Sequence, residues 1–438
     1  MSWGRYPVSD QKAVSSYWHQ DIDLSQFEQS MLPFGNGRSY GDSCLNHDGA
    51  LFDCRPLNRY INFDEGTGVL TCEAGVTLEQ ILLDFVPRGY FLPVTPGTKY
   101  ITVGGAIAND VHGKNHHVSG TFGCHVQEFE LLRSTGERLL CSPTRNSDLF
   151  QATIGGLGLT GIITWASFKL ISISSSYIQQ KSIKFGHVDE FFDLVPKYDS
   201  DFDYTVAWLD TQQKGRALGR GLLMLGNFAD GNEVSGDTLA VHGKKKVTIP
   251  FAFPGFALNS LSVSAFNFLY YNKQLSKETD GLVHYDPFFY PLDSVSQWNL
   301  IYGRRGFVQY QFVVPPAVSK DVVRLILLKV AKEGKASFLS VLKLFGSVNS
   351  PGLLSFPDEG ATLALDFPFE GKKTLDMLSY LDDLIAESGG RVYPAKDARM
   401  SAAHFQKFFP NWEKLESLRD PKFNSEFWQR VVQQGEPQ

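Results

Sequence analysis

The first 170 residues alternate short apolar runs with turns that contain glycine. Strands are predicted at 50–54, 68–75 and 161–170, and the apolar spacing of 77–90 predicts an amphipathic helix between them. The residues from Ala402 onward have a helical pattern rich in Phe and Trp, so we expect them to pack back onto a domain.

The second half of the chain also mixes strands and helices. Strands are predicted at 204–209 and 307–314, and helices that end at glycine are predicted at 321–335 and 373–390. This order of elements predicts an α+β fold whose second domain is one sheet covered by helices.

One apolar segment interrupts this pattern. No charged residue occurs from Val247 to Asn272, directly after three lysines at 244–246. Its prolines, glycine and polar residues argue against a transmembrane helix. Two interpretations remain: a buried loop and hairpin, or a mobile apolar flap with a cationic rim. The flap would allow 244–272 to contact a membrane or admit a lipid-tailed substrate.

Composition excludes several classes of protein. The chain has 438 residues, of which 43% are hydrophobic and 20% charged, which suits two soluble domains. Its net charge of −6 argues against a nucleic-acid partner. Five cysteines without a C-x-x-C pair indicate reduced thiols, and the first residues lack a signal-peptide pattern. We therefore expect a cytoplasmic protein without a metal site.

Glycine-rich loops predict a cofactor site. In chain order, the first glycine loop is 33–42 and the second is the stretch from Val94 to Phe122. The second loop has neither a helical nor a strand period. Glycine permits close backbone approach, and open backbone N–H groups bind anions such as a pyrophosphate. A third glycine motif at 156–161 fits G-x-G-x-x-G. A β-branched strand follows it where a dinucleotide-binding site needs a helix, so we reject that interpretation.

These loops resemble a known family. GNGRSYGD at 35–42, TPGTKYITVGGAIANDVHGKNHH at 95–117 and IGGLGLTGII at 154–163 are similar to the flavin-binding stretches of FAD-linked oxidoreductases of the vanillyl-alcohol oxidase type. Within it, the chain is most similar to the oxidase subunits of decaprenylphosphoryl-β-D-ribose 2-epimerases, which act in cell wall arabinan synthesis. The similarity continues through YTVAWLD at 204–210, FVQYQFVVP at 307–315, SFLSVLKLFG at 337–346 and GGRVYPAKDAR at 389–399.

The resemblance implies a two-part FAD-binding domain, formed by 1–174 and 391–438, with a substrate domain inserted at 175–390. It also implies that FAD is bound non-covalently, because Ser39, Tyr40 and Gly41 stand where covalent members carry a histidine. The implied flavin contacts are Gly35, Asn36, Gly37, Arg38, Ser39, Tyr40, Gly41, Asp42, Gly97, Thr98, Val103, Gly104, Gly105, Ala106, Asn109, His112, Ile162 and Tyr393.

The resemblance also implies a set of residues on the sugar side. Lys396, His112, Gln311 and Lys114 are the implied catalytic residues, and Tyr40, Trp208, Gln309 and Lys343 the implied substrate contacts. On residue chemistry alone, Lys396 and Lys114 could instead be surface charges and Trp208 a core residue. His116 and His117 could be loop histidines with satisfied hydrogen bonds. Ala364 and Thr362 replace a cysteine and an asparagine of the family, so covalent nitroaromatic inhibitors of that cysteine should not act here.

The implied reaction is FAD-dependent oxidation of the C2 hydroxyl of a polyprenylphosphoryl-β-D-ribose to the 2-keto sugar. A separate NADH-dependent short-chain reductase would then complete the epimerisation to the arabinose form. Two alternatives remain: an oxidase of a soluble sugar, alditol or aldonolactone, similar to D-arabinono-1,4-lactone oxidase, and a non-catalytic flavin-binding protein. The uncharged segment at 247–272 favours a lipid-tailed substrate over a soluble one.

Overall fold

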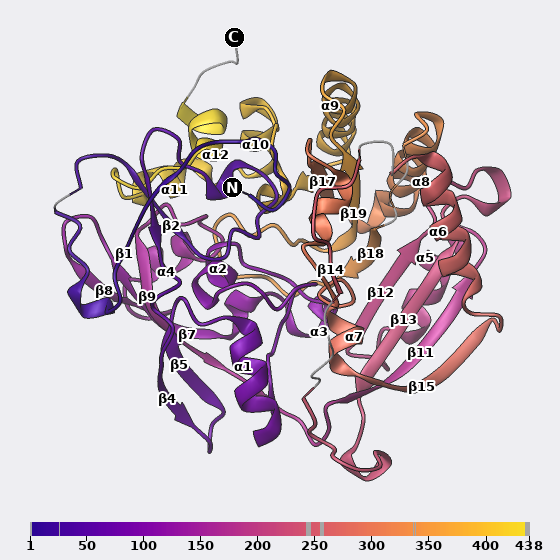
Figure 1. Cartoon of the computed structure of the whole chain (residues 1–438), viewed down its shortest axis with the longest axis horizontal. Helices are drawn as coiled ribbons and strands as arrows, with labels where there is room; N and C mark the ends of the chain where they lie inside the picture. The colour runs from indigo at the N-terminus through magenta and orange to yellow at the C-terminus, as the bar shows by residue number, and fades with distance from the viewer. Residues whose placement is uncertain are drawn as a thin grey trace.

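A five-stranded antiparallel sheet lies in the first part of the chain (Figure 1). The computed structural model describes residues 2–25, 27–241, 247–254, 258–335, 337 and 339–433. The strand order is β4-β5-β9-β7-β8. The strands are β4 (Tyr60–Asp64), β5 (Val69–Glu73), β7 (Val126–Leu132), β8 (Arg138–Cys141) and β9 (Ile162–Lys169). The helix predicted at 77–90 is α1 (Leu78–Phe85), which begins at a capping box formed by Thr77 and Gln80.

A small parallel sheet joins the two ends of the chain. It has the order β1-β3-β2, with β1 (Lys12–Ser15), β2 (Met31–Phe34) and β3 (Ala50–Asp53). The backbone of Met31 bonds to Lys422 and Asn424. The C-terminal helices are α10 (Ala402–Phe408), α11 (Trp412–Leu418) and α12 (Glu426–Trp428), followed by a π-helical turn over Gln429–Gln433. Phe405, Phe427 and Trp428 are fully buried, which confirms that this segment packs back onto the protein.

An eight-stranded antiparallel sheet forms the second part of the structure. Its order is β15-β11-β13-β12-β18-β19-β17-β20. The strands are β11 (Tyr177–Phe185), β12 (Tyr204–Leu209), β13 (Gly221–Phe228), β15 (Glu278–His284), β17 (Phe307–Val314), β18 (Ser340–Phe345), β19 (Gly360–Pro368) and β20 (Arg391–Val392). Helices α5 (Val188–Tyr198), α8 (Pro316–Lys332) and α9 (Lys372–Glu387) pack on one face, in the largest hydrophobic cluster. The α+β class and the helix-covered sheet are confirmed.

Shorter elements connect these sheets. The helices are α2 (Val103–Ala108), α3 (His116–Ser119), α4 (Ser147–Thr153), α6 (Ser260–Asn272) and α7 (Tyr285–Phe289). The two-residue strands are β6 (Tyr90–Phe91), β10 (Ile171–Ser172), β14 (Val247–Thr248) and β16 (Val295–Ser296). The 3-10 turns are His19–Asp21, Asp42–Cys44, Val86–Arg88, Phe122–His125, Gly215–Ala217, Gly231–Glu233, Trp298–Tyr302 and Pro394–Lys396.

The division of the chain into domains is a proposal. We propose boundaries near residues 174 and 390, because β10 ends the first set of strands at Ser172 and β11 opens the second sheet at Tyr177. Arg391 and Val392 pair with β17, so the return to the first domain begins just after Val392.

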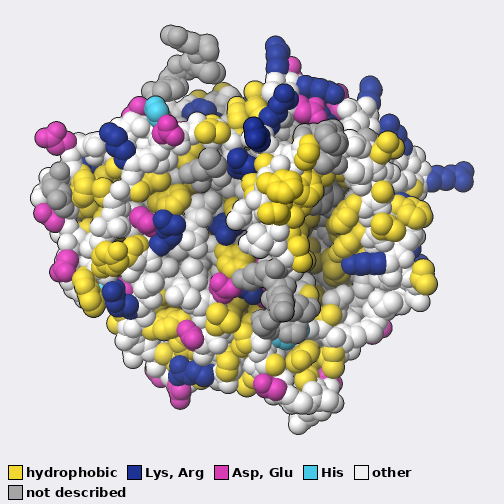
Figure 2. Space-filling view, in the orientation of Figure 1, with side chains coloured by type: hydrophobic (Ala, Val, Ile, Leu, Met, Phe, Trp, Pro, Cys, Tyr) yellow, Lys and Arg dark blue, Asp and Glu magenta, His cyan; other side chains and the backbone are white. Residues whose placement is uncertain are grey.

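The interpretation of 247–272 as a buried hairpin is wrong. Residues 260–272 form α6, because the side chain of Asn259 accepts hydrogen bonds from Leu261 N and Ser262 N and so starts a helix. Leu261, Phe268 and Leu269 of α6 are largely exposed, and hydrophobic side chains are visible over this helix (Figure 2). The three lysines at 244–246 lie outside the described residues, as does Phe256. Within the described ranges, no helix has the length and apolar character required to cross a membrane.

Candidate active site

A cavity of about 560 Å³ is lined by residues of both the five-stranded and the eight-stranded sheet. Its walls come from the first glycine loop, from residues 95–114, from one face of the eight-stranded sheet and from the turn Pro394–Lys396. This volume lies within the range of roughly 300–1,000 Å³ of small-molecule and cofactor sites. The implied flavin residues that line it are Gly35, Asn36, Gly37, Arg38, Ser39, Tyr40, Gly97, Thr98, Gly104, Gly105, Asn109, His112 and Tyr393.

Close backbone approach explains two of the glycines. A Cβ atom at Gly35 would lie 2.4 Å from Oγ1 of Thr102, the residue that caps α2. A Cβ atom at Gly41 would lie 1.6 Å from the carbonyl oxygen of Asp397. Glycine at these positions therefore lets the first loop touch both the second loop and the turn that carries Lys396.

Five of the residues implied to contact the flavin do not line the cavity. They are Gly41, Asp42, Val103, Ala106 and Ile162. The carboxylate of Asp42 is buried and pairs with Arg430, which also bonds Asp397, so Asp42 holds the loop in place. Ile162 packs in a hydrophobic cluster with Met31 and Leu132, because alternate residues of β9 face opposite sides. Its neighbour Ile163 faces the cavity.

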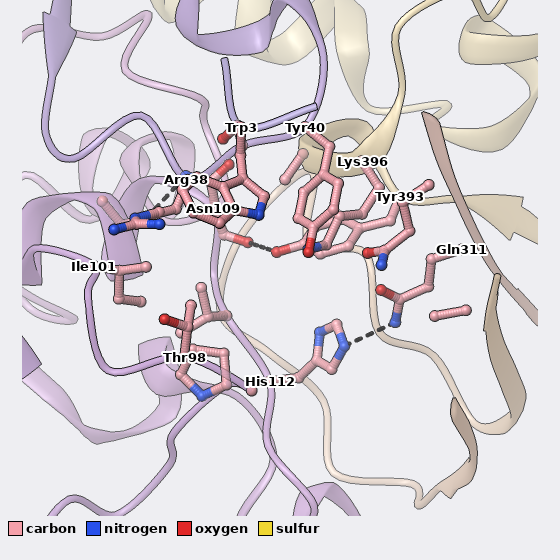
Figure 3. A pocket seen from close by; sticks show the side chains of 18 of the residues that line it. Trp3, Arg38, Tyr40, Thr98, Ile101, Asn109, His112, Gln311, Tyr393 and Lys396 are labelled. Atoms are coloured by element: carbon pink, nitrogen blue, oxygen red, sulfur yellow. Dashed lines mark hydrogen bonds between the residues drawn. The ribbon is translucent and has the colours of Figure 1, made fainter. Parts of the chain in front are cut away.

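His112 and Gln311 meet inside the cavity (Figure 3). Nε2 of Gln311 lies 3.0 Å from Nε2 of His112 and also donates to Oγ1 of Thr362. An amide NH₂ group can only donate, so Nε2 of His112 accepts. Burial, and then the charges of Lys343, His116 and Lys396, lower the pKa of His112 well below its usual value. The imidazole is therefore neutral at pH 7, with its proton on Nδ1.

Lys396 lies against the ring of Tyr40, with Nζ 3.7 Å from the ring centroid. The fully buried Asp366 of β19 lines the same part of the cavity and accepts a hydrogen bond from Gln309. Burial lowers the pKa of Lys396, and the charge of Asp366 opposes that shift. Burial likewise raises the pKa of Asp366. Since burial disfavours the charged form of both groups, this pair can hold or release a proton.

Two further lysines, Lys114 and Lys343, line the cavity and are half-buried. Nζ of Lys343 donates to the carbonyl oxygen of Gly113 at 3.0 Å, and Nζ of Lys114 donates to that of Phe288. Burial lowers the pKa of each to about 7. The surface-charge interpretation of Lys114 and Lys396 is therefore wrong.

One face of the large sheet supplies the remaining contacts. Trp208 lines the cavity at 6% exposure, so the choice between core residue and pocket wall is settled in favour of the wall. All eight implied catalytic and substrate residues line the cavity: Lys396, His112, Gln311, Lys114, Tyr40, Trp208, Gln309 and Lys343. His116 and His117 do not line it; Nε2 of His117 bonds the carbonyl oxygen of Phe202.

Some lining residues were not predicted. Asp366 follows Ala364 by two positions in β19, and both face the cavity, so strand alternation alone would have indicated it. Trp3 lies 4.0 Å from the guanidinium carbon of Arg38, a contact between distant segments without a local signal. The glycines at 156–161 follow α4 and precede β9, which confirms the rejection of a dinucleotide fingerprint there.

These residues suit FAD on structural grounds. Nε of Arg38 and Nδ1 of His112 are buried without a hydrogen-bond partner among the described residues, and both residues line the cavity. Buried N–H donors normally have hydrogen-bond partners, so a bound ligand with acceptor atoms would supply the partners that these two nitrogens lack. Arg38 belongs to the glycine loop at 33–42, whose backbone N–H groups suit a pyrophosphate, and His112 lies against Gln311 of the sheet, on the side that suits a flavin ring.

Comparison with known proteins agrees with this geometry. Residues 23–142 match a family model described as FAD binding domain. The chain is 37% identical over 402 residues, 90% of its length, to decaprenylphosphoryl-beta-D-ribose oxidase of Mycolicibacterium smegmatis, of which the match covers 86%. The chain belongs to this family of FAD-linked oxidases. It is thus an FAD-dependent oxidoreductase, and the non-catalytic alternative falls away.

Other members are similar over less of their length. A putative D-arabinono-1,4-lactone oxidase of Neurospora crassa is 34% identical over 26% of this chain and 20% of its own. L-gulonolactone oxidase of Mus musculus is 29% identical over 31% of each protein. The similarity to lactone oxidases is therefore confined to a part of the chain.

Proposed function

We propose that this protein oxidises the C2 hydroxyl of a polyprenylphosphoryl-β-D-ribose to the corresponding 2-keto sugar. The observation that carries the proposal is the convergence of His112, Gln311 and Lys396, from three distant segments, on one cavity lined by the glycine loops. The Mycolicibacterium smegmatis oxidase, similar over most of the chain, bears the name of such a substrate.

The residues of the cavity suit oxidation of a secondary alcohol. Bound FAD supplies the hydride acceptor. The amide oxygen of Gln311 accepts a hydrogen bond from the sugar hydroxyl, because both amide hydrogens are already bonded to His112 and Thr362. The ammonium of Lys396 stabilises negative charge that develops on the hydroxyl oxygen. Asp366, whose pKa is raised by burial, provides a place for the hydroxyl proton. His112 contributes a neutral Nδ1–H donor to the flavin side.

FAD binding is proposed to be non-covalent. In the first loop, Ser39 and Tyr40 line the cavity and offer no histidine or cysteine for attachment. Denaturation in acid should release all of the flavin into the supernatant, whereas flavin that stays with the protein would contradict the proposal.

The proposal includes contact with a membrane surface and a separate reductase partner. The exposed apolar residues of α6 support contact with a membrane surface, where a lipid-tailed substrate resides. The 2-keto product requires reduction to reach the arabinose form, which a separate NADH-dependent reductase would perform.

The deciding experiment is anaerobic bleaching of the bound flavin. The purified holoenzyme is mixed with polyprenylphosphoryl ribose, with L-gulono-1,4-lactone or with xylitol. Bleaching by the lipid-linked ribose alone is expected. Bleaching by the soluble compounds alone would instead establish the second candidate, a soluble sugar or lactone oxidase, which the partial similarity to lactone oxidases favours.

A further inference from the structure

Lys114 and Lys343 are two half-buried cations of the cavity wall, and neither has a carboxylate partner in the part of the chain that the structure describes. Among the described residues, no Asp or Glu oxygen lies within salt-bridge distance of either Nζ atom, and each makes one hydrogen bond, to a backbone carbonyl. An ammonium group has three N–H donors, so both groups keep donors for a ligand. Lys343 bonds the carbonyl oxygen of Gly113, the residue before Lys114, so the two lysines lie on adjoining parts of the cavity wall.

Among the described residues, the fully buried lysines are paired. Lys99 lies against Asp286, and Lys335 lies 2.5 Å from Glu370. Charges removed from water are normally paired because desolvation of an isolated charge is costly. Lys114 and Lys343 face the cavity with only part of each side chain exposed and have no such partner, so an anionic ligand would neutralise them.

The order of residues across the cavity wall indicates which anion would bind at Lys343. Four neighbouring strands form one continuous wall, because their cavity-facing residues pair in register: Gln311 with Ala364, Ala364 with Val341, and Val341 with Trp208. Moving across the sheet, β17 and β19 contribute the polar Gln309, Gln311 and Asp366. Then β18 contributes Lys343. Beyond it, β12 and β13 contribute Val206, Trp208 and Met224, and α6 contributes Phe266 and Tyr270.

The cavity wall is thus ordered as hydroxyl-binding groups, then ammonium groups, then an apolar surface. The loop with Lys114 is held beside this boundary, because the carbonyl oxygen of Lys114 accepts a hydrogen bond from Thr205 N, next to Val206. A sugar, a phosphate and a hydrocarbon chain joined in that order match the three zones.

We propose that Lys114 and Lys343 form an anion subsite that binds the phosphate of the sugar substrate, with the adjoining apolar wall receiving the first part of its hydrocarbon chain. This rests on the proposed function for the identity of the sugar. The subsite itself rests on the two unpaired lysines and the order of the wall. It distinguishes a phosphorylated substrate from a neutral lactone or alditol, which would leave both ammonium groups without a counter-ion.

The test compares two substrates with the holoenzyme. Farnesylphosphoryl-β-D-ribose carries the phosphate, whereas farnesyl β-D-ribofuranoside lacks it. In Lys343→Met and in Lys114→Met we expect the KM for the phosphorylated substrate to rise about 10- to 100-fold, the range for a lost charge-assisted hydrogen bond. The KM for the neutral riboside should rise less, so the preference for the phosphorylated substrate, given by the ratio of the two KM values, should fall. Lys335→Met is the matched control, because Lys335 is buried but outside the cavity.

Equal weakening of both substrates in the lysine variants, or no weakening of either, would overturn the proposal. A second measurement separates it from the proposed function. Farnesyl phosphate and inorganic phosphate are titrated into the wild type and into Lys343→Met, with flavin absorbance as the readout. If neither riboside is oxidised, tight lysine-dependent binding of farnesyl phosphate still supports the subsite. Absence of such binding, or inorganic phosphate binding equally well, overturns it.

Discussion

Gln311 of β17 and His112 of the second glycine loop lie 3.0 Å apart, although 199 positions separate them in the chain. The contact joins the eight-stranded sheet to the glycine loop, both of which line the cavity. Because the amide donates to Nε2, the imidazole presents Nδ1–H to its other side, where the structure has no partner for it among the described residues. This one contact therefore sets both the orientation and the tautomer of His112.

Loss of either partner should slow the reaction by a similar amount. We expect Gln311→Leu and His112→Ala each to lower the rate of anaerobic flavin reduction about 10²- to 10³-fold, the effect of removing one preorganised donor. Because the two residues act as a unit, the double variant should be little slower than either single variant. Flavin absorbance per protein gives the FAD content. Full additivity of the two effects, or loss of FAD in Gln311→Leu, would contradict the arrangement.

Arg430 links the C-terminal segment to both sides of the flavin site. Its guanidinium pairs with Asp42 at 2.8 and 2.9 Å and with Asp397 at 2.9 Å, and both carboxylates are buried. Arg430→Met leaves two buried carboxylates without their cation, so we expect a loss of about 3–5 kcal/mol in the free energy of unfolding. FAD should also bind more weakly, since Asp42 follows the first glycine loop and Asp397 follows Lys396.

The matched control for this prediction is Arg55→Met. Arg55 pairs with Asp53 on the surface and is about half exposed, so its removal should change the free energy of unfolding by less than about 1 kcal/mol. Denaturant unfolding of both variants provides the comparison. Equal effects of the two substitutions would show that the buried cluster does not stabilise the fold as inferred.

Local patterns predicted much of the fold. The boundaries expected for β12 and β17 agree with the structure at both ends, since their apolar, β-branched runs have clear limits. The interpretation of 247–272 failed for a physical reason. α6 buries a polar residue, Asn267, which donates a hydrogen bond to Asp210 directly after β12, and it exposes the apolar Leu261, Phe268 and Leu269. A helix with this inverted distribution gives no amphipathic signal in the sequence.

The candidate site was only partly accessible from the sequence. The glycine loops indicated a cofactor because their composition alone requires close approach to a ligand. Whether a strand residue faces the cavity depends on how the strand pairs with its neighbours, and the sequence of one strand alone does not specify that pairing. That is why Ile162 was expected at the flavin and Ile163 faces the cavity. Trp3 was missed because its contact with Arg38 joins distant segments. Asp366 was missed although it lies two positions after Ala364 on the same face of β19.

The exposed face of α6 yields a prediction about membranes. Phe268→Ser with Leu269→Ser replaces two side chains that are 57% and 68% exposed, so the fold and the FAD content should not change. If α6 contacts lipid, binding to anionic vesicles in a sedimentation assay should fall several-fold, since each buried apolar side chain contributes ~1.5–3 kcal/mol. Leu325→Ser with Leu328→Ser, on the exposed side of α8, is the control and should leave vesicle binding unchanged. An equal fall in both pairs would exclude a specific role for α6.

Lys343 makes stability depend on pH in a defined direction. Burial lowers its pKa to about 7, whereas an unfolded lysine titrates near 10.4. Between these values the unfolded chain binds more protons than the folded one, so this lysine makes stability rise with pH. Below pH 7 the folded protein must keep the buried charge, and the destabilisation is greatest. Lys343→Met removes this contribution, so any advantage of the variant should shrink as pH rises from 7 to 8.5, by up to ~1.4 kcal/mol per pH unit. Denaturant unfolding of the substrate-free holoenzyme in phosphate-free buffer measures it, and a difference that stays constant over this range would contradict the lowered pKa.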